Sequence, residues 1–264
     1  MKIKSKIIAV TGAGGGIGSA IVSRLIERGA EVAAIDLKAE SMISLIEKYP
    51  GKVTAYAVNI TDRQSVDKLP EQIIADLGAI DGIIHCAGII QPFVKVTELD
   101  YDAIDKVINV NLYGTIYINK AFLPHLLKRP EAHLVNFSSM GGFLPVPGQA
   151  IYGASKAGVK LLTEALYAEL LSTNVGVSVV FPGATETSIT QNSGVKRPKS
   201  SAEDAKKYKM LAPEKVAELV VEGVEKNKLQ IFTGTDSNFM NRFYRFSPTR
   251  ATGFIAKKMA SLLE

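Results

Sequence analysis

The chain has 264 residues, of which 47% are hydrophobic and 22% charged, and its formal net charge is +5. This is enough apolar material for a full core, and α/β chains of this length commonly form one domain. No run approaches the roughly 20 apolar residues of a membrane-spanning helix, and the opening residues lack the pattern of a secretory signal. Because Cys86 is the only cysteine, an intramolecular disulfide is excluded and we expect a cytoplasmic protein.

The positive charge is concentrated in two segments. Residues 195–210 hold six Lys or Arg against two acidic residues, and residues 238–264 hold five against one. A nucleic-acid interface would need a basic stripe together with a reading motif, and neither segment carries one. We therefore interpret both segments as solvated basic surfaces and predict no nucleic-acid partner.

Short apolar runs alternate along the chain with longer segments of helical periodicity, which is typical of βαβ units and a parallel sheet. The runs are rich in Val and Ile and do not alternate with polar residues, as expected for strands covered on both faces. Seven strands are predicted, at residues 7–10, 31–35, 53–58, 82–86, 133–137, 175–181 and 230–233. Helices are predicted between them, for example over residues 17–28, 63–77, 114–127, 152–171 and 213–226. The predicted fold class is α/β, a three-layer doubly wound parallel sheet of the Rossmann type, with residues 1–264 as one catalytic domain.

Two stretches depart from this rhythm. Residues 188–211 are polar, Lys-rich and long for a connection, so we interpret them as a substrate lid. After the last predicted strand, apolar residues recur at helical spacing and predict a C-terminal helical extension, with residues 238–264 as a tail. This tail could pack on a neighbouring subunit or lie in a membrane interface. Packing is favoured because Pro248 and Gly253 interrupt a longer interfacial helix.

A glycine-rich turn joins the first predicted strand to the first predicted helix and reads Thr-Gly-Ala-Gly-Gly-Gly-Ile-Gly from residue 11 to residue 18. Backbone N–H groups of such a turn can approach a pyrophosphate, whose charge is favoured by the helix N-terminus. Glycines alone often mark only a flexible loop, but the flanking strand and helix here favour a dinucleotide site. The expected contacts are Gly12, Gly14, Gly15, Gly16, Ile17 and Gly18.

Asp36 ends the second predicted strand, eighteen residues after Gly18. An acid at about this distance, ~20 residues, accepts hydrogen bonds from the adenosine ribose. Its charge would repel a 2′-phosphate, and neither Gly14 nor Gly15 supplies a basic side chain to offset the repulsion. We therefore predict that NAD is preferred, while the nearby Lys38 leaves NADP open.

Tyr152 and Lys156 stand four residues apart at the start of a predicted helix and therefore share one face. An ammonium about 4 Å from a phenol supplies about 4 kcal/mol at an effective dielectric of ~20, enough to lower a pKa of about 10 by two to three units. Ser139 follows the fifth predicted strand, and ligands bind at the carboxyl ends of parallel strands. Its hydroxyl is expected to hold the substrate oxygen. A Tyr and a Lys at this spacing are usually ordinary helix surface, but the glycine turn and Asp36 favour a redox site.

Together these residues resemble the short-chain dehydrogenases/reductases, in their short single-domain branch, over about residues 5–235. The family's motifs fall in order on Gly12, Gly16 and Gly18, on Asn111, on Ser139, and on Tyr152 and Lys156. The resemblance implies that Tyr152 is the general acid/base and that Lys156 lowers its pKa and holds the nicotinamide ribose. It also implies that Ser139 positions the substrate and that Asn111 supports a water-linked proton path.

The resemblance implies further cofactor contacts around the adenine, after the fourth strand and in a Pro-Gly-x-x-x-Thr segment. They are Leu37, Asn59, Ile60, Cys86, Ala87, Gly88, Pro182, Gly183, Thr185 and Thr187. The family usually shows Asn-Asn-Ala-Gly after its fourth strand, whereas this chain has His85 and Cys86 at the first two positions. The change removes two side-chain amides but leaves backbone contacts. We interpret His85 and Cys86 as packed strand-end residues and predict no metal, because no partner ligands accompany them.

The predicted function is an NAD(P)-dependent oxidoreductase that interconverts a secondary alcohol and a carbonyl by hydride transfer. Two alternatives stay open: an epimerase or dehydratase that retains its cofactor, and a dinucleotide-sensing or scaffold module without turnover. Phe93, Phe143, Leu144 and Val146 lie in the expected substrate loops and predict a largely apolar small-molecule substrate. Family resemblance also implies a homodimer or homotetramer.

Overall fold

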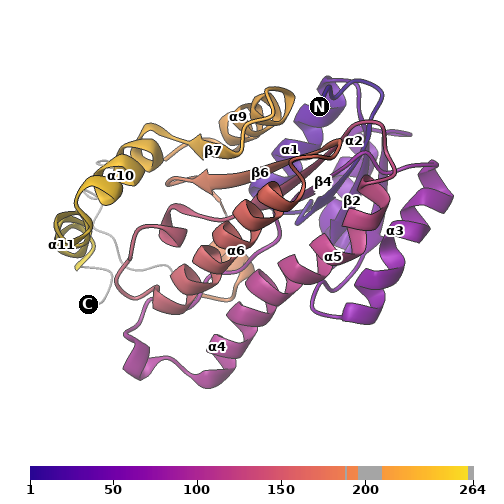
Figure 1. Ribbon diagram of the computed structural model, residues 1–264. Coiled ribbons are helices and arrows are strands. Elements are labelled where there is room, and N and C mark those ends of the chain that lie inside the picture. Colours follow the sequence, from indigo (N-terminus) through magenta and orange to yellow (C-terminus); the bar gives the residue numbers. More distant parts are fainter. Residues whose placement is uncertain (188, 196–209, 261–264) are drawn as a thin grey trace.

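One parallel sheet of seven strands runs through the molecule in the order β3-β2-β1-β4-β5-β6-β7 (Figure 1). The computed structural model describes residues 1–187, 189–195 and 210–260. The strands are β1 (Ile7–Thr11), β2 (Glu31–Asp36), β3 (Val53–Ala57), β4 (Gly82–His85), β5 (Ala132–Phe137), β6 (Val175–Pro182) and β7 (Gln230–Thr233). Each of the seven predicted strands is present, which confirms the predicted doubly wound α/β fold.

Helices cover both faces of the sheet. One face carries α1 (Gly16–Glu27), α2 (Ile43–Lys48) and α9 (Pro213–Glu225), and the other carries α3 (Arg63–Leu77), α4 (Tyr101–Ile108), α5 (Gly114–Leu126) and α6 (Ala150–Glu169). The other α-helices include α7 (Ile189–Asn192), α10 (Thr235–Phe246) and α11 (Pro248–Lys258). Neither α2 nor α4 was predicted from the sequence.

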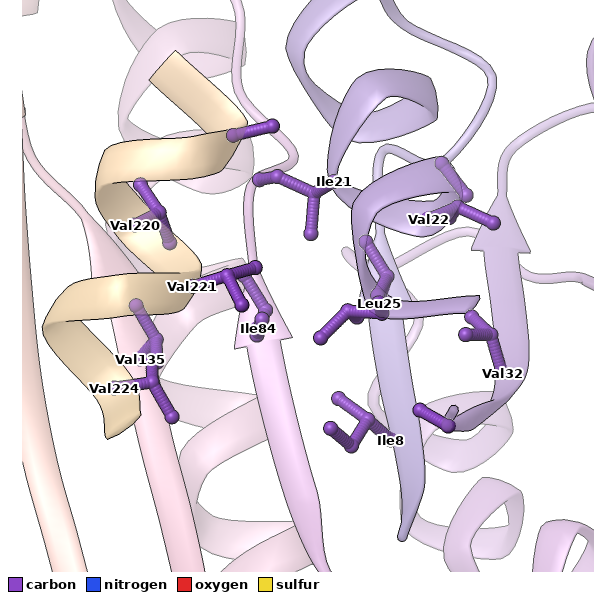
Figure 2. Close-up of a cluster of buried hydrophobic side chains, with 14 of the residues drawn as sticks. Ile8, Ile21, Val22, Leu25, Val32, Ile84, Val135, Val220, Val221 and Val224 are labelled. Atoms are coloured by element: carbon purple, nitrogen blue, oxygen red, sulfur yellow. The ribbon is translucent and has the colours of Figure 1, made fainter. Parts of the chain in front are cut away.

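Alternate residues of each central strand point into two separate apolar cores. In β1, Ile8 packs with α1 and α9, whereas Ala9 packs with α3 and α5. Figure 2 shows the first core, in which Leu25 of α1 and Val221 of α9 point toward each other above the sheet. Strands buried on both faces are apolar at most positions, which explains why their sequences read as nearly continuous apolar runs.

The chain reverses its direction of winding between β1 and β4, which lie side by side in the middle of the sheet. After β1 the chain enters α1 on one face, and after β4 it continues to α4 on the other face. The loops that follow these two strands therefore diverge at their carboxyl ends. In open α/β sheets this point of divergence forms the ligand-binding crevice.

The predicted C-terminal helical extension is confirmed by α10 and α11, which pack against each other beyond β7. Their inner side forms a small core in which Met240 and Ile255 contact Leu144. Leu144 was expected to line the substrate pocket, but it is fully buried in this core because the tail helices cover it.

Most of the predicted lid, residues 188–211, and residues 261–264 of the tail lie outside the described residues. None of the helices in the described ranges is long and apolar enough to cross a bilayer.

Candidate active site

The glycine-rich turn passes directly over the residues that follow β4. Gly12 adopts a left-handed φ of 69°, and a Cβ at this position would lie 2.9 Å from the backbone of Ala87. A Cβ on Gly18 would overlap the carbonyl oxygen of Gly12. Side chains at positions 12 and 18 would therefore push the turn away from β4 and from the start of α1. The glycines keep the N-terminus of α1 open to an anion.

A cavity of about 600 Å³ lies above this turn, at the carboxyl ends of β1, β2 and β4. The predicted cofactor residues that line it are Gly12, Gly14, Gly15, Gly16, Ile17, Gly18, Asp36, Leu37, Asn59, Ile60, Cys86, Ala87, Gly88 and Thr187. Pro182, Gly183 and Thr185 lie outside its wall, as do Tyr152 and Lys156. Among the lining residues that no sequence pattern indicated are Ser41, Lys106 and Gln191. The cavity thus brings together most of the predicted dinucleotide contacts.

The Asp36 carboxylate lies at the rim of this cavity, at the end of β2. One of its oxygens accepts a hydrogen bond from the backbone N–H of Gly14 at 2.9 Å, and the other accepts one from Leu37 at 2.7 Å. These bonds fix the carboxylate beside the glycine turn. A carboxylate retains further acceptor sites on each oxygen, so Asp36 can still accept from ribose hydroxyls.

The imidazole of His85 connects the ends of β4 and β1. Its Nδ1 lies 2.8 Å from Oγ1 of Thr11, and the same oxygen accepts a hydrogen bond from the N–H of Ala87 at 3.2 Å. Burial, with a smaller contribution from the nearby Lys156, lowers the pKa of His85 to about 3, so the ring is neutral at pH 7. Burial also raises the pKa of the Cys86 thiol to about 12, which leaves it protonated. His85 therefore supports the start of the loop that lines the cavity.

Tyr152 of α6 and Ser139, which follows β5, lie close together at Gly141, where a Cβ would be 3.6 Å from Oγ of Ser139 and also near the Tyr152 ring. Burial raises the pKa of Tyr152, and the nearby Ser139 hydroxyl partly offsets that rise. A Cβ on Gly141 would lie 3.5 Å from the Tyr152 ring, so this glycine allows the loop to pass close to the phenol. In this structure the phenol is neutral at pH 7, because burial outweighs the stabilisation of a phenolate.

Lys156 is buried, with 4% of its surface exposed, and its ammonium donates to the carbonyl oxygen of Phe137 at 2.9 Å. Burial lowers the pKa of Lys156 to about 8. The backbone carbonyl of Lys156 also accepts a hydrogen bond from Oγ of Ser138 at 2.7 Å. The side chain and the backbone carbonyl of Lys156 are thus both hydrogen-bonded to residues at the end of β5. The lowering of the Tyr152 pKa by this ammonium stays a prediction.

Asn111 occupies a single π-helical turn, Asn109–Tyr113, between α4 and α5. Its amide exchanges two hydrogen bonds of 2.9 Å with the backbone of Ile89 and donates a third to Ser155 at 3.1 Å. A Cβ on Gly88 would lie 3.0 Å from the Lys156 nitrogen and 3.2 Å from Oδ1 of Asn111. The extra residue of a π-turn commonly marks a functional site. Here it brings Asn111 close to Lys156 beside the cavity.

A buried glutamine that no sequence pattern indicated holds the start of α6. Oε1 of Gln91 accepts a hydrogen bond from the backbone N–H of Tyr152 at 2.8 Å, and Nε2 donates to the carbonyl of Gly148 at 3.1 Å. Gln149 donates back to the carbonyl of Gln91 at 3.2 Å. Gln149, the residue that precedes α6, makes no side-chain capping hydrogen bond to this helix. Gln91 therefore satisfies an otherwise free N–H group in the first turn of α6. A loop glutamine has no characteristic spacing and gives no signal in the sequence.

The chain is similar to proteins of a known family. The sequence model described as "short chain dehydrogenase" matches residues 6–198. The chain is 35% identical over 226 residues to the 3-oxoacyl-(acyl-carrier-protein) reductase FabG of Thermotoga maritima, which covers 84% of this chain and 91% of that protein.

Solved structures show the same fold. A short chain dehydrogenase/reductase from Burkholderia phymatum, in complex with NAD, superposes with a TM-score of 0.84 at 23% identity and covers 94% of this chain and 96% of that one. A short chain dehydrogenase from Burkholderia cenocepacia, in complex with NADP, gives a TM-score of 0.82 at 24% identity over 97% and 99% of the two chains.

Proposed function

This chain belongs to the short-chain dehydrogenase family of oxidoreductases, and we propose that it interconverts a secondary alcohol and a carbonyl with a nicotinamide dinucleotide. The observation that carries the proposal is the position of Tyr152 beside Ser139, at the sheet edge that also holds the 600 Å³ cavity. A proton-transferring hydroxyl and a dinucleotide cavity at one sheet edge are the two components that a two-electron carbonyl reduction requires.

The residues of the cavity fit a dinucleotide. Glycines stand where a Cβ would collide with neighbouring backbone, the N-terminus of α1 begins at Gly16, and the Asp36 carboxylate faces the same space. When bound, the cofactor supplies or accepts the hydride. We propose that Asp36 binds the adenosine ribose and that Lys156 binds the nicotinamide ribose. Lys106 and Gln191 also line the cavity, in addition to the predicted cofactor contacts.

In the reducing direction, Ser139 would donate a hydrogen bond to the substrate carbonyl and Tyr152 would release its proton to the developing alkoxide. Burial raises the pKa of Tyr152, so the phenol still carries at pH 7 the proton that it would donate in this direction. In the oxidising direction the phenol must lose its proton first, and the ammonium of Lys156 favours that loss. Asn111, beside Lys156 at Gly88, would support the water-linked path that restores the proton.

A preference for NAD is proposed from the position of Asp36. Its oxygens already accept from Gly14 and Leu37, so the negative charge is fixed at the cavity wall, where we propose that the adenosine ribose binds. Asp36→Ala should shift the ratio of NADP to NAD affinity toward NADP by about tenfold or more, because it removes the repulsion. Fluorescence titration with the two reduced cofactors measures the ratio, with Glu40→Gln as an exposed control. Tighter binding of NADPH by the unmodified chain would contradict the proposal.

The proposed substrate carries a largely apolar substituent. Phe143, in the loop after Ser139, packs edge-on against Phe181 at 5.5 Å and Phe232 at 6.2 Å, and these rings give that loop a rigid apolar base. The relative in Thermotoga maritima is named as a reductase of 3-oxoacyl chains, so 3-oxoacyl thioesters belong among the first compounds tested. We also propose a cytoplasmic homodimer or homotetramer in which residues 188–211 act as the lid.

The decisive experiment follows reduced cofactor at its absorbance band during a screen of ketones, 3-oxoacyl thioesters and secondary alcohols. Tyr152→Phe should lower kcat by about 10³-fold to 10⁴-fold, because it removes the proton donor, while the Kd for the cofactor stays unchanged. Tyr167→Phe, in the same helix, is the matched control. Undiminished turnover by Tyr152→Phe would exclude the proposed mechanism. Cofactor binding without turnover across the whole screen would favour the sensor alternative.

A further inference from the structure

Three phenylalanines of the C-terminal helices point into solvent. Phe239 and Phe246 of α10 are 62% and 89% exposed, and Phe254 of α11 is 41% exposed. Single exposed apolar side chains are common on proteins, whereas a contiguous exposed apolar patch marks an interaction site. Figure 1 places α10 and α11 at one end of the molecule, on the side away from α3.

The exposed rings belong to one continuous patch. Phe243 lies between the helices, with its ring centroid 6.1 Å from that of Phe239 and 6.0 Å from that of Phe254. Phe246 comes seven residues after Phe239, which places both on the same face of α10. The opposite side of the two helices is packed, because Met240 and Ile255 are buried against Leu144. The helices therefore present the aromatic patch from a fixed base.

Positive charge surrounds these rings. The cations of α10 and α11 are all exposed and are Arg242, Arg245, Arg250, Lys257 and Lys258. The ammonium of Lys258 lies 5.1 Å from the centre of the Phe254 ring. Asp236 is the only acidic residue of the two helices, and its carboxylate accepts a hydrogen bond from the N–H of Ala184 at 3.0 Å. We call the patch formed by Phe239, Phe243, Phe246, Phe254 and these five cations the aromatic-basic surface.

We propose that the aromatic-basic surface docks on an anionic lipid bilayer. In-plane helices bind such membranes by inserting aromatic side chains at the headgroup level while Lys and Arg contact lipid phosphates. A second copy of the chain fits this surface less well than a bilayer does. Two such surfaces facing each other would bring the arginines of one copy against those of the other, and Asp236 is the one acidic residue that α10 and α11 contribute. Subunit packing, which the sequence favoured, is disfavoured at this surface for that reason.

The test is co-sedimentation of the full chain with vesicles of phosphatidylcholine, with and without phosphatidylglycerol. Binding is expected only with phosphatidylglycerol present, and it should weaken in about 0.5 M salt, where charges are screened within a few ångströms. Replacing Phe239, Phe246 and Phe254 together by Ser should weaken partitioning by about tenfold or more, because apolar burial is lost. Arg242→Glu and Arg245→Glu should each weaken it by roughly fivefold or more.

Matched controls distinguish binding by the aromatic-basic surface from nonspecific adsorption through other exposed apolar residues. Tyr101, Leu161 and Leu171 are 83%, 67% and 66% exposed and lie elsewhere, so their combined replacement by Ser should leave vesicle binding unchanged. Circular dichroism and thermal unfolding confirm that each variant is folded. The proposal is overturned if the unmodified chain ignores phosphatidylglycerol vesicles or if the Phe variant binds them equally well. Native mass spectrometry provides a third check. If the unmodified chain and the control variant form a dimer and the Phe variant does not, the surface binds a second copy of the chain and the proposal is overturned.

Discussion

The two ends of the sheet bury charge in opposite ways. At the amino ends of the strands, Asp81 is 3% exposed and is fully compensated. One carboxylate oxygen lies 2.9 Å from Nε of Arg129 and 3.8 Å from Nζ of Lys6, and the other accepts the N–H of Ile7 at 3.0 Å. These contacts join β1, β4 and the loop before β5.

At the carboxyl ends, Lys156 is buried to the same degree but has only a neutral partner, the carbonyl of Phe137. Throughout residues 1–187, 189–195 and 210–260 it forms no ion pair with a carboxylate. Burial accordingly lowers its pKa to about 8.

This difference separates stabilising charge from functional charge. A buried ion that is paired and hydrogen-bonded recovers most of its lost hydration, whereas an unpaired one does not. Perturbed groups of the second kind cluster at sites that must change charge or bind a charged ligand. We call the contacts of Asp81 with Arg129, Lys6 and Ile7 the Asp81 clamp, because they stabilise the fold. We call the carboxyl end of the sheet, which holds Lys156, the working surface.

The largest expected effect on stability comes from removing the Asp81 carboxylate, and its absence would contradict the difference between the two ends of the sheet. Asp81→Asn should lower the free energy of unfolding by about 2 kcal/mol, because it leaves Arg129 without its carboxylate and Lys6 with Glu131 alone, at 3.7 Å. This is less than the roughly 3–5 kcal/mol of a fully buried pair, since the side chain of Arg129 is 36% exposed and can be hydrated. Urea unfolding measures the change.

Asp67→Asn is the control for this clamp. Asp67 lies 3.9 Å from Arg63 at the surface, with side chains that are 53% and 73% exposed. Its loss should change stability by less than about 0.5 kcal/mol. Equal effects of the two substitutions would show that burial does not distinguish Asp81.

A smaller effect, on catalysis, sharpens the description of the working surface. Gln91→Leu removes the acceptor for the N–H of Tyr152 and the donor to Gly148, so the first turn of α6 loosens and Tyr152 moves relative to Ser139. We expect kcat to fall by about tenfold, as small displacements of a catalytic group do, with an unchanged cofactor Kd. Gln72→Leu, at an exposed position of α3, is the control.

The response of substrate binding separates positioning from general destabilisation. If Gln91 positions Tyr152, kcat falls much more than KM changes, and Gln91→Glu restores part of the rate because its carboxylate still accepts the N–H. A variant that loses cofactor affinity and turnover in parallel would show that Gln91 supports the fold rather than the catalytic group.

The parts of the molecule that were predictable are those in which one segment carries its own signal. Strands such as β1 are buried on both faces and therefore read as apolar runs. The glycine turn and the pair Tyr152 and Lys156 have fixed spacings because each is built on a single turn or helix. Such local constraints are visible in one sequence, and the structure brings the residues they indicated to the same sheet edge.

The parts that were missed depend on contacts between distant segments. Asp81 meets Arg129 across 48 residues, and Gln91 meets Tyr152 across 61. Leu144 reads as a pocket residue until α10 and α11 are seen to cover it. The π-turn at Asn111 requires one extra residue between two helices, and helical periodicity does not reveal it.

The smallest predicted effect concerns the stability cost of Lys156. Because burial lowers its pKa from 10.5 to about 8, the unfolded chain binds this proton more tightly than the folded chain does. The buried ammonium therefore destabilises the cofactor-free protein fully below pH 8, and this cost disappears as the pH rises from about 8 toward 10.5. Lys156→Met should abolish turnover yet raise the free energy of unfolding at pH 7 by about 1 kcal/mol, since relief of desolvation is partly offset by the unpaired carbonyl of Phe137.

The pH dependence of this gain is the sharper measurement. Denaturant unfolding of both proteins between pH 7 and about pH 10 should show the advantage of Lys156→Met shrinking as the wild-type lysine loses its proton in the folded state. Lys160→Met, which breaks the partly exposed pair with Glu164 one turn further along α6, should instead lose a few tenths of a kcal/mol. If Lys156→Met were destabilised at pH 7 as strongly as Asp81→Asn, Lys156 would be a second clamp, and the contrast between the two ends of the sheet would not hold.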